Sequence, residues 1–213
     1  MFANIATIDG PPASGKTTMA KMIAKELGLI HIDSGSVFRA ITTFCLEKGS
    51  DFSPANIISQ LPYMDIKLDN EHIYLNGKDV SETIRTPYVT KNVCRLSNLP
   101  EVRKFVKDFQ LEYSNNGKII CDGRKVGTEV FPEASVKFYL TADQRTRALR
   151  RFLQLRKTSP AIAFADVYDD LKEREETERA NKILLIPENA IIIDNTSLTI
   201  EETFSIMEEY LLQ

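Results

Sequence analysis

The stretch GPPASGKT, residues 10–17, matches the pattern G-x-x-x-x-G-K-[ST] at every fixed position. Glycines in this pattern let successive backbone N–H groups turn toward a phosphate, and the following helix adds the favourable field of its N-terminus. An apolar run, residues 2–8, ends just before the stretch, and Met19, Ile23 and Leu27 follow it at helical spacing. This order of strand, glycine loop and helix predicts a phosphate-binding loop and favours it over a chance glycine-rich turn.

The chemistry of such a loop assigns roles to its last residues. Lys16 would reach the β- and γ-phosphates of a nucleotide, and the hydroxyl of Thr17 or Thr18 would contact Mg²⁺. The loop predicts nucleotide binding but not a particular reaction, because GTPases, motor ATPases and kinases share it.

Beyond the loop, short apolar runs alternate with helical patterns. We expect strands near residues 3–8, 29–32, 118–121, 136–140 and 190–193. We expect helices over residues 14–27, 102–113, 143–156, 166–181 and 200–212, a loop over 33–36 that leads into a further helix, and a break at 158–160. This alternation predicts a doubly wound α/β domain with a five-stranded parallel sheet and flanking helices, the fold of P-loop NTPases.

The middle of the chain has a different pattern. Residues 64–68 and 72–75 are short alternating segments that predict a small β-hairpin, and residues 81–97 are polar and partly helical. We therefore predict an inserted subdomain over residues 62–98, with a core domain formed by residues 1–61 and 99–213.

Composition limits the classes of partner. The chain has 213 residues, of which 43% are hydrophobic and 27% charged, and its net charge is -3. This charge does not indicate binding to a nucleic-acid polymer. Its 3 cysteines are widely spaced, and no apolar stretch reaches the length of a membrane span. The start of the chain lacks a signal-peptide layout. We expect a cytoplasmic protein that has small-molecule partners, no membrane partner, and a monomer as the default state.

Arginines favour a kinase among the nucleotide-binding classes. Phosphoryl transfer gathers several negative charges, and arginine stays charged and grips phosphate with two donors. Arg39 and Arg124 each stand beside a glycine-containing loop after a predicted strand, which favours a functional role. For Arg145 and Arg147 a solvated helix surface is the better interpretation, and Arg174 has the spacing of a simple i,i+4 ion pair with Glu178.

Along nearly its whole length the chain resembles the bacterial cytidylate kinases, a family of P-loop nucleoside monophosphate kinases. The segments that carry the resemblance are ATIDGPPASGKTT, HIDSGSVFRA, LNGKDVSETIR, LPEVRKFVKDFQ, IICDGRKVGTEVFPEASVKFYLTA and IIIDNTSLTIEE. The resemblance includes the insertion at 62–98, which this family carries as its monophosphate-binding domain. It implies transfer of the γ-phosphoryl group of ATP to CMP or dCMP, with ATP as co-substrate, Mg²⁺ as cofactor and a helical lid over about residues 154–182.

The resemblance also implies which residues bind each group. The ATP-binding residues would be Gly10, Ala13, Ser14, Gly15, Lys16, Thr17 and Thr18. The residues near Mg²⁺ would be Thr17, Thr18 and Asp122. The acceptor nucleotide would be contacted by Ser34, Arg39, Arg103, Asp122, Arg124 and Glu178. The transferred group would be stabilised by Lys16, Arg124, Arg150, Arg151 and Arg174, with Arg179 as a further candidate.

The chain departs from the family at positions associated with the acceptor. Lys125 replaces an acid and Cys94 replaces a serine, both on the cytosine side. On the lid helix, Glu178 lengthens an acid that would hold the ribose, and Asn181 takes the place of an arginine. A site that selects by hydrogen bonding loses discrimination when its polar partners change. Lys125 has the spacing to pair with Glu129, or it contacts another phosphate.

Two other functions therefore stay open at this point. One is a P-loop kinase for another acceptor, such as UMP or a small-metabolite hydroxyl. The other is a catalytically weak regulatory protein that binds ATP.

Overall fold

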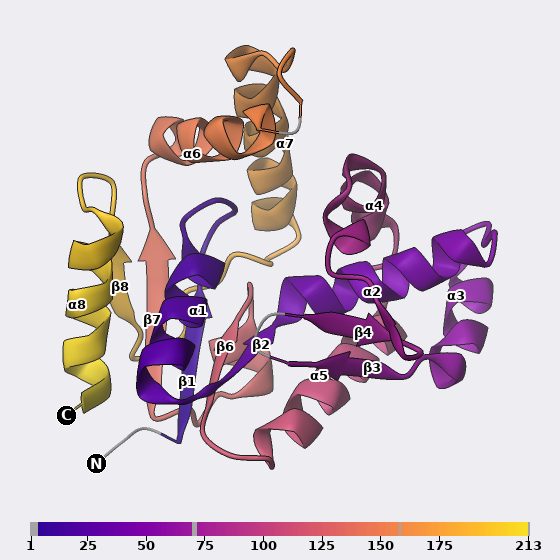
Figure 1. Ribbon diagram of the computed structural model, residues 1–213, viewed down its shortest axis with the longest axis horizontal. Helices are drawn as coiled ribbons and strands as arrows, with labels where there is room; N and C mark the ends of the chain where they lie inside the picture. Colours follow the sequence, from indigo (N-terminus) through magenta and orange to yellow (C-terminus); the bar gives the residue numbers. More distant parts are fainter. Residues whose placement is uncertain (1–3, 70–71, 158, 213) are drawn as a thin grey trace. The chain divides into compact units, whose positions relative to one another are not determined.

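A five-stranded parallel sheet with flanking helices organises the chain, in a computed structural model that describes residues 4–69, 72–157 and 159–212 (Figure 1). The strand order is β2-β6-β1-β7-β8. The strands are β1 (Ile5–Asp9), β2 (Ile30–Asp33), β6 (Ile119–Asp122), β7 (Val136–Thr141) and β8 (Ile191–Asp194). The predicted α/β fold is confirmed, and each strand ends one residue later than expected because the polar residue after each apolar run still belongs to the strand.

The chain divides into two compact units. One consists of Met1–Leu29 together with Lys118–Gln213, and the other of Ile30–Gly117. We call them the first and the second unit. The segment 62–98, predicted as an insertion, lies within the second unit. Its role in binding a monophosphate stays a prediction.

Parallel strands bring four chain segments of the first unit to one edge. Strand β1 pairs in parallel with β6 and with β7, and β7 pairs in parallel with β8. The carboxyl ends of these strands therefore lie side by side, and in Figure 1 the helices α6 (Gln144–Arg156) and α7 (Phe164–Ala180) lie beyond the arrowhead of β7. The apolar core joins these strands to α1 (Lys16–Leu27) and α8 (Ile200–Leu212) and includes Ile8, Met19, Phe138 and Met207. The predicted lid, about residues 154–182, includes the last residues of α6 and all of α7.

The second unit has its own core. Its helices are α2 (Ser34–Glu47), α3 (Pro54–Gln60), α4 (Pro87–Asn92) and α5 (Pro100–Ser114), with short 3₁₀ turns between them. Strands β3 (Ile66–Leu68) and β4 (Ile73–Leu75) are antiparallel, which confirms the predicted hairpin, and β5 (Lys78–Asp79) extends it. Two residues of the expected hairpin turn, 70 and 71, lie outside the described residues, as does Thr158 of the expected helix break.

The predicted loop at residues 33–36 is wrong, because α2 begins directly at Ser34. Asp33 ends β2 and caps the helix, with its carboxylate accepting the backbone N–H of Ser36 at 3.0 Å. A side chain that caps the first turn removes the need for a connecting loop. At the end of α1, Gly28 adopts φ 64, as expected for a left-handed C-cap.

Within the part of the chain that the structure describes, none of the helices has the length and apolar character needed to cross a bilayer.

Candidate active site

The candidate site lies at the carboxyl edge of the first unit's strands. The loop 10–17 follows β1, residues 123–124 follow β6, α6 follows β7, and Asn195 follows β8. In open α/β sheets ligands bind outside the carboxyl ends of the strands. The order of the elements thus brings distant residues to one place.

The phosphate-binding loop runs close to strand β7. Gly10 has φ 147, and a Cβ at this position would lie 2.1 Å from the carbonyl oxygen of Leu140. Gly15 and Ala13 also have positive φ, at 95 and 60. The loop therefore needs glycine at residue 10 both for its backbone conformation and for its contact with the neighbouring strand.

Replacing Gly10 by alanine should lower the free energy of unfolding by about 3 kcal/mol, because the neighbouring atom is backbone and must shift. The matched control is Gly28→Ala, where φ is also positive but no atom lies within 4 Å. We expect that control to cost about 1 kcal/mol. Urea denaturation of both variants measures the difference, and equal losses would contradict the close approach at Gly10.

Lys16 begins helix α1 with its side chain turned back into the loop. Its ammonium group donates to the carbonyl oxygen of Pro11 at 2.6 Å and to Ser14 Oγ at 3.3 Å. Burial holds the pKa of Lys16 well below its usual value, the charge of Arg124 lowers it further, and Asp122 and other acids oppose the shift. A phosphate bound at the loop would favour the charged lysine for the same electrostatic reason.

Thr17 and Asp122 form an oxygen-rich pair beside the loop. Thr17 Oγ1 donates to Asp122 Oδ2 at 2.7 Å, and Asp122 is buried, whereas Thr18 is exposed. Mg²⁺ prefers oxygen donors and commonly takes few from the protein when substrate phosphates supply others. Among the described residues no cluster of three or more His, Cys, Asp or Glu side chains could hold a metal ion alone. The hydroxyl and carboxylate therefore fit Mg²⁺ bound together with a nucleotide.

Asp9 positions the turn that follows β6, a role that the sequence analysis missed. Its two carboxylate oxygens accept the backbone N–H groups of Val126 and Gly127 at 2.8 and 2.7 Å. Burial raises the pKa of Asp9, although these hydrogen bonds and the nearby Lys16 oppose the shift. The turn continues as a π-helix over Val126–Val130, a feature that often marks functional sites. The place of Asp9 directly before the loop was the signal in the sequence.

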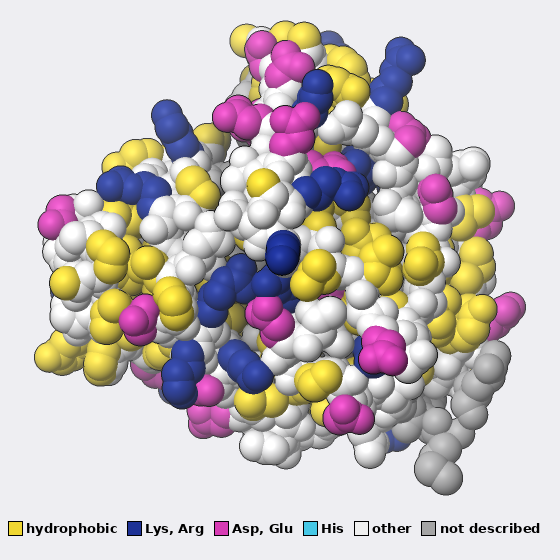
Figure 2. Space-filling model, turned by 180° about the vertical axis from the view of Figure 1, so that it is seen from behind, with side chains coloured by type: hydrophobic (Ala, Val, Ile, Leu, Met, Phe, Trp, Pro, Cys, Tyr) yellow, Lys and Arg dark blue, Asp and Glu magenta, His cyan; other side chains and the backbone are white. Residues whose placement is uncertain are grey.

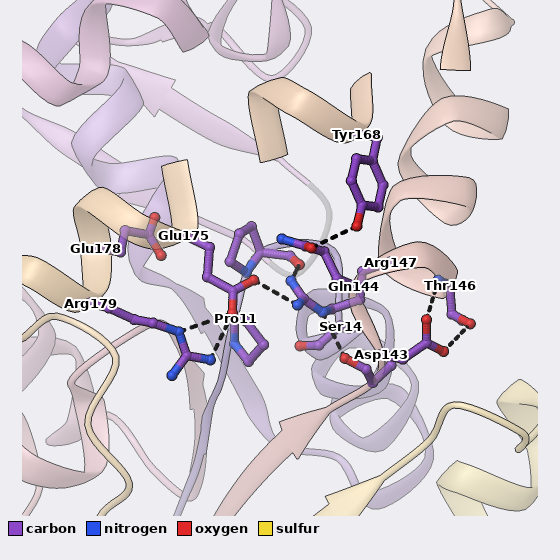
Figure 3. A network of polar contacts seen from close by, with 12 residues as sticks. Pro11, Ser14, Asp143, Gln144, Thr146, Arg147, Tyr168, Glu175, Glu178 and Arg179 are labelled. Atoms are coloured by element: carbon purple, nitrogen blue, oxygen red, sulfur yellow. Dashed lines mark hydrogen bonds and ion pairs between the residues drawn. The ribbon is translucent and has the colours of Figure 1, made fainter. Parts of the chain in front are cut away.

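Arg147 is buried, so the expectation of a solvated helix surface is wrong for this residue. Its guanidinium donates to the carbonyl oxygens of Ala142 at 2.8 Å and Pro12 at 3.2 Å, and its Nη2 lies 2.6 Å from Glu175 Oε2 (Figure 3). Arg147 thus joins the phosphate-binding loop to helix α7. Arg145, on the same helix, is exposed as expected.

Arg150 contacts Asn195, which follows β8. Its Nη1 donates to Asn195 Oδ1 and its Nη2 to the Asn195 carbonyl oxygen, each at 2.8 Å. Asn195 is buried and donates in turn to the carbonyl oxygen of Ser14 at 3.0 Å. Arg151 donates to Gln154 at 2.9 Å. The catalytic roles of both arginines stay predictions.

Glu178 connects two arginines that the sequence analysis singled out. Arg124 Nε lies 2.9 Å from Glu178 Oε2, and Arg174 Nε lies 3.0 Å from Glu178 Oε1. Burial alone would raise the pKa of Glu178, but the charges and hydrogen bonds of the two arginines hold it below its usual value. The predicted Arg174 pair is confirmed, and so is that of Lys125 with Glu129 at 2.6 Å. On the face of the molecule drawn in Figure 2, acidic side chains lie among the basic ones.

The second unit contains three of the predicted acceptor-binding residues. Ser34 is buried at the start of α2 and accepts a hydrogen bond from Gln110 Nε2 at 2.6 Å. Arg39 lies further along α2. Burial alone would raise the pKa of Asp33, but the charge of His31, hydrogen bonds from Ser36 and the charge of Arg39 hold it below its usual value. Arg103 lies on α5, as does Gln110. Gln110 could not be predicted from the sequence, because a polar residue in a predicted helix carries no signal of burial.

The chain is similar to known proteins in sequence and in fold. The family described as cytidylate kinase matches residues 6–213. The chain is 39% identical over 198 residues to the cytidylate kinase of Caldanaerobacter subterraneus subsp. tengcongensis, covering 92% of this chain and 88% of the relative. It is 39% identical over 202 residues to that of Carboxydothermus hydrogenoformans, covering 92% and 91%. The fold is similar to a shikimate kinase from Bacteroides thetaiotaomicron, with a TM-score of 0.51, 12% identity and 98% coverage of both chains.

Proposed function

The chain belongs to the cytidylate kinase family, and from this we infer that it transfers the γ-phosphoryl group of ATP to CMP or dCMP, giving ADP and CDP or dCDP. The observation that carries the proposal is the phosphate-binding loop with its buried Lys16 beside Asp122 and Arg124. That arrangement supplies fixed positive charge where the phosphates of a nucleotide would bind.

In the proposed reaction an oxygen of the acceptor's phosphate attacks the γ-phosphorus of ATP in line. The bond from that phosphorus to the bridging oxygen breaks, and ADP leaves. The protein needs no nucleophile of its own. Its contribution is to hold both nucleotides and to neutralise the charge of the transferred group, with Lys16 from the loop, Arg124 after β6 and Arg174 from α7.

We propose that Thr17 and Asp122 hold Mg²⁺ with the nucleotide, and Thr18 remains a candidate. The 2.7 Å contact of Thr17 with Asp122 supports this assignment. When bound, Mg²⁺ neutralises charge on the phosphate oxygens. For the acceptor we propose Ser34, Arg39 and Arg103 of the second unit.

Three of the four positions that depart from the family pattern, Lys125, Cys94 and Asn181, make local contacts. Lys125 pairs with Glu129, Cys94 Sγ donates to the carbonyl oxygen of Lys91 at 3.3 Å, and Asn181 Nδ2 donates to that of Thr177 at 2.9 Å. Each donor group therefore has a partner within its own turn. UMP or a small-metabolite hydroxyl stays the alternative acceptor.

A panel of acceptors tests the proposal. With Mg²⁺-ATP, ADP should form at least about tenfold faster with CMP or dCMP than with UMP, AMP or GMP, because a site that hydrogen-bonds one base leaves groups unpaired with another. Chelation of Mg²⁺ should stop the reaction. Faster ADP formation with another acceptor would support kinase activity but refute CMP and dCMP as the preferred acceptors. ATP binding without transfer to any acceptor would favour the regulatory alternative.

We further propose that the protein acts as a cytoplasmic monomer in pyrimidine nucleotide metabolism. Its partners would then be nucleotides rather than nucleic-acid polymers, as expected from the net charge of -3.

A further inference from the structure

We propose that Glu178 is a positioning residue, which holds the Nε edges of Arg124 and Arg174 so that their terminal amino groups face the transferred phosphoryl group. This inference rests on the proposed function. It differs from the role that the resemblance implies, in which this acid binds the ribose of the acceptor, and the kinetics below distinguish the two roles.

The geometry of the three side chains carries the first step. Each carboxylate oxygen of Glu178 accepts one Nε–H group, from Arg124 at 2.9 Å and from Arg174 at 3.0 Å. Arg174 lies one turn away on the same helix, whereas Arg124 comes from the end of β6. One buried acid therefore joins cations from two distant parts of the first unit.

The terminal nitrogens of these arginines carry the second step. A guanidinium has five N–H donors, of which Nε supplies one. In the part of the chain that the structure describes, the other hydrogen bond from this pair is a long one, from Arg124 Nη1 to the carbonyl oxygen of Gly123 at 3.4 Å. Most of the terminal donors are thus left for a phosphate, which arginine binds with two parallel hydrogen bonds.

Charge balance carries the third step. Arg124 repels the buried Lys16, and Glu178 is among the acids that oppose this effect. Lys16, Arg124 and Glu178 therefore belong to one electrostatic cluster beside the phosphate-binding loop. Without Glu178, the repulsion between the cations would move the arginines away from the positions that a phosphate needs.

The length of the acid matters as well. Aspartate is one methylene shorter, which removes about 1.5 Å of reach. From the backbone of α7, an aspartate would lose contact with Arg124 before it lost contact with Arg174, because Arg174 is on the same helix. The longer acid of this chain is accordingly suited to hold both arginines.

Kinetics of Glu178→Gln and Glu178→Asp test the inference. The glutamine has the same size but presents an amide donor to one arginine, so we expect kcat to fall roughly 10- to 100-fold, with an acceptor KM that changes much less. The loss should be equal for CMP and dCMP, and Glu178→Asp should fall between the wild type and Glu178→Gln. The matched control is Glu176→Gln, an exposed acid on the same helix, which should keep wild-type kinetics.

Other kinetic outcomes would overturn the inference. A loss with CMP but not with dCMP would show that the carboxylate binds the ribose 2′-hydroxyl. An unchanged kcat would show that the arginines do not need the acid. Thermal unfolding of each variant separates these effects from misfolding.

A second measurement does not depend on activity. In proton NMR of the arginine Nε–H groups, two downfield signals that exchange slowly should be present in the wild type and in Glu176→Gln, and should shift in Glu178→Gln. Arg124→Lys and Arg174→Lys assign them. If the wild type phosphorylates no acceptor, the proposed function fails, and these signals alone decide whether Glu178 holds the arginines. Their absence from the wild type would refute the positioning role.

Discussion

Replacing Lys16 by alanine is expected to lower kcat/KM for ADP formation by at least about 10³-fold, the upper range for loss of a fixed electrostatic contact in a phosphoryl-transfer site. The ammonium group is buried in the phosphate-binding loop, where it donates to Pro11 and Ser14. Burial makes its charge costly in the free protein, so the bound phosphates gain a partner that is poorly solvated. A coupled assay of ADP release measures the loss.

Lys21→Ala is the control for this variant, because Lys21 is exposed on the same helix. It should leave the rate within about twofold of the wild type, as expected for an exposed side chain away from the site. Comparable rates for Lys16→Ala and the wild type would contradict the assigned role of the loop.

Arg147→Leu should lower the free energy of unfolding by about 3 to 5 kcal/mol, the usual cost of removing one partner of a buried ion pair. Arg147 is 3% exposed and Glu175 is 6% exposed, and the leucine would leave Glu175 with Arg179 as its cation. The carbonyl oxygens of Pro12 and Ala142 would also lose a donor. Urea denaturation measures the effect.

The matched control is Arg145→Leu, an exposed arginine two residues earlier, which should change stability by less than about 0.5 kcal/mol. In Arg147→Leu/Glu175→Leu, part of the loss should be recovered, since the buried carboxylate that lost its buried partner Arg147 is also removed. Equal effects of Arg145→Leu and Arg147→Leu would refute the buried network.

The effect of Arg147→Leu should also depend on pH. Burial alone would raise the pKa of Glu175, but Arg179 and Arg147 hold it below its ordinary value of 4.5. A carboxyl group whose pKa is lower in the folded than in the unfolded state stabilises the fold at pH values above its unfolded-state pKa. This stabilisation is lost as the pH falls through the folded-state pKa. The difference between the wild type and Arg147→Leu should therefore narrow as the pH falls below about 4.5 and through the folded-state pKa of Glu175. A constant difference would contradict the ion pair.

The fold could be predicted because its signals are local. Each strand is a short apolar run followed by a polar residue, and the loop 10–17 carries its chemistry in consecutive residues. The pairs of Lys125 with Glu129 and Arg174 with Glu178 follow from the four-residue spacing of a helix.

The contacts that the sequence could not predict join distant segments. Arg147 is buried because α6 places it against the loop and α7, and a charged residue in a helical pattern gives no sign of this. Asp9 accepts hydrogen bonds from residues 117 and 118 positions away. Helix α7 is rich in charge, yet Glu175 and Glu178 are both buried. Tertiary pairing of opposite charges thus overrides the expectation that charged residues face solvent.

Transfer of labelled phosphate tests the central claim most directly. Incubation of the protein with CMP, Mg²⁺ and ATP that is radiolabelled at the γ-phosphate should place the label in the β-phosphate of CDP, in a one-to-one ratio with the ADP formed. The same reaction with Lys16→Ala should yield no labelled CDP above background. Label that appears only in inorganic phosphate, or in another acceptor in preference to CMP and dCMP, would contradict the account.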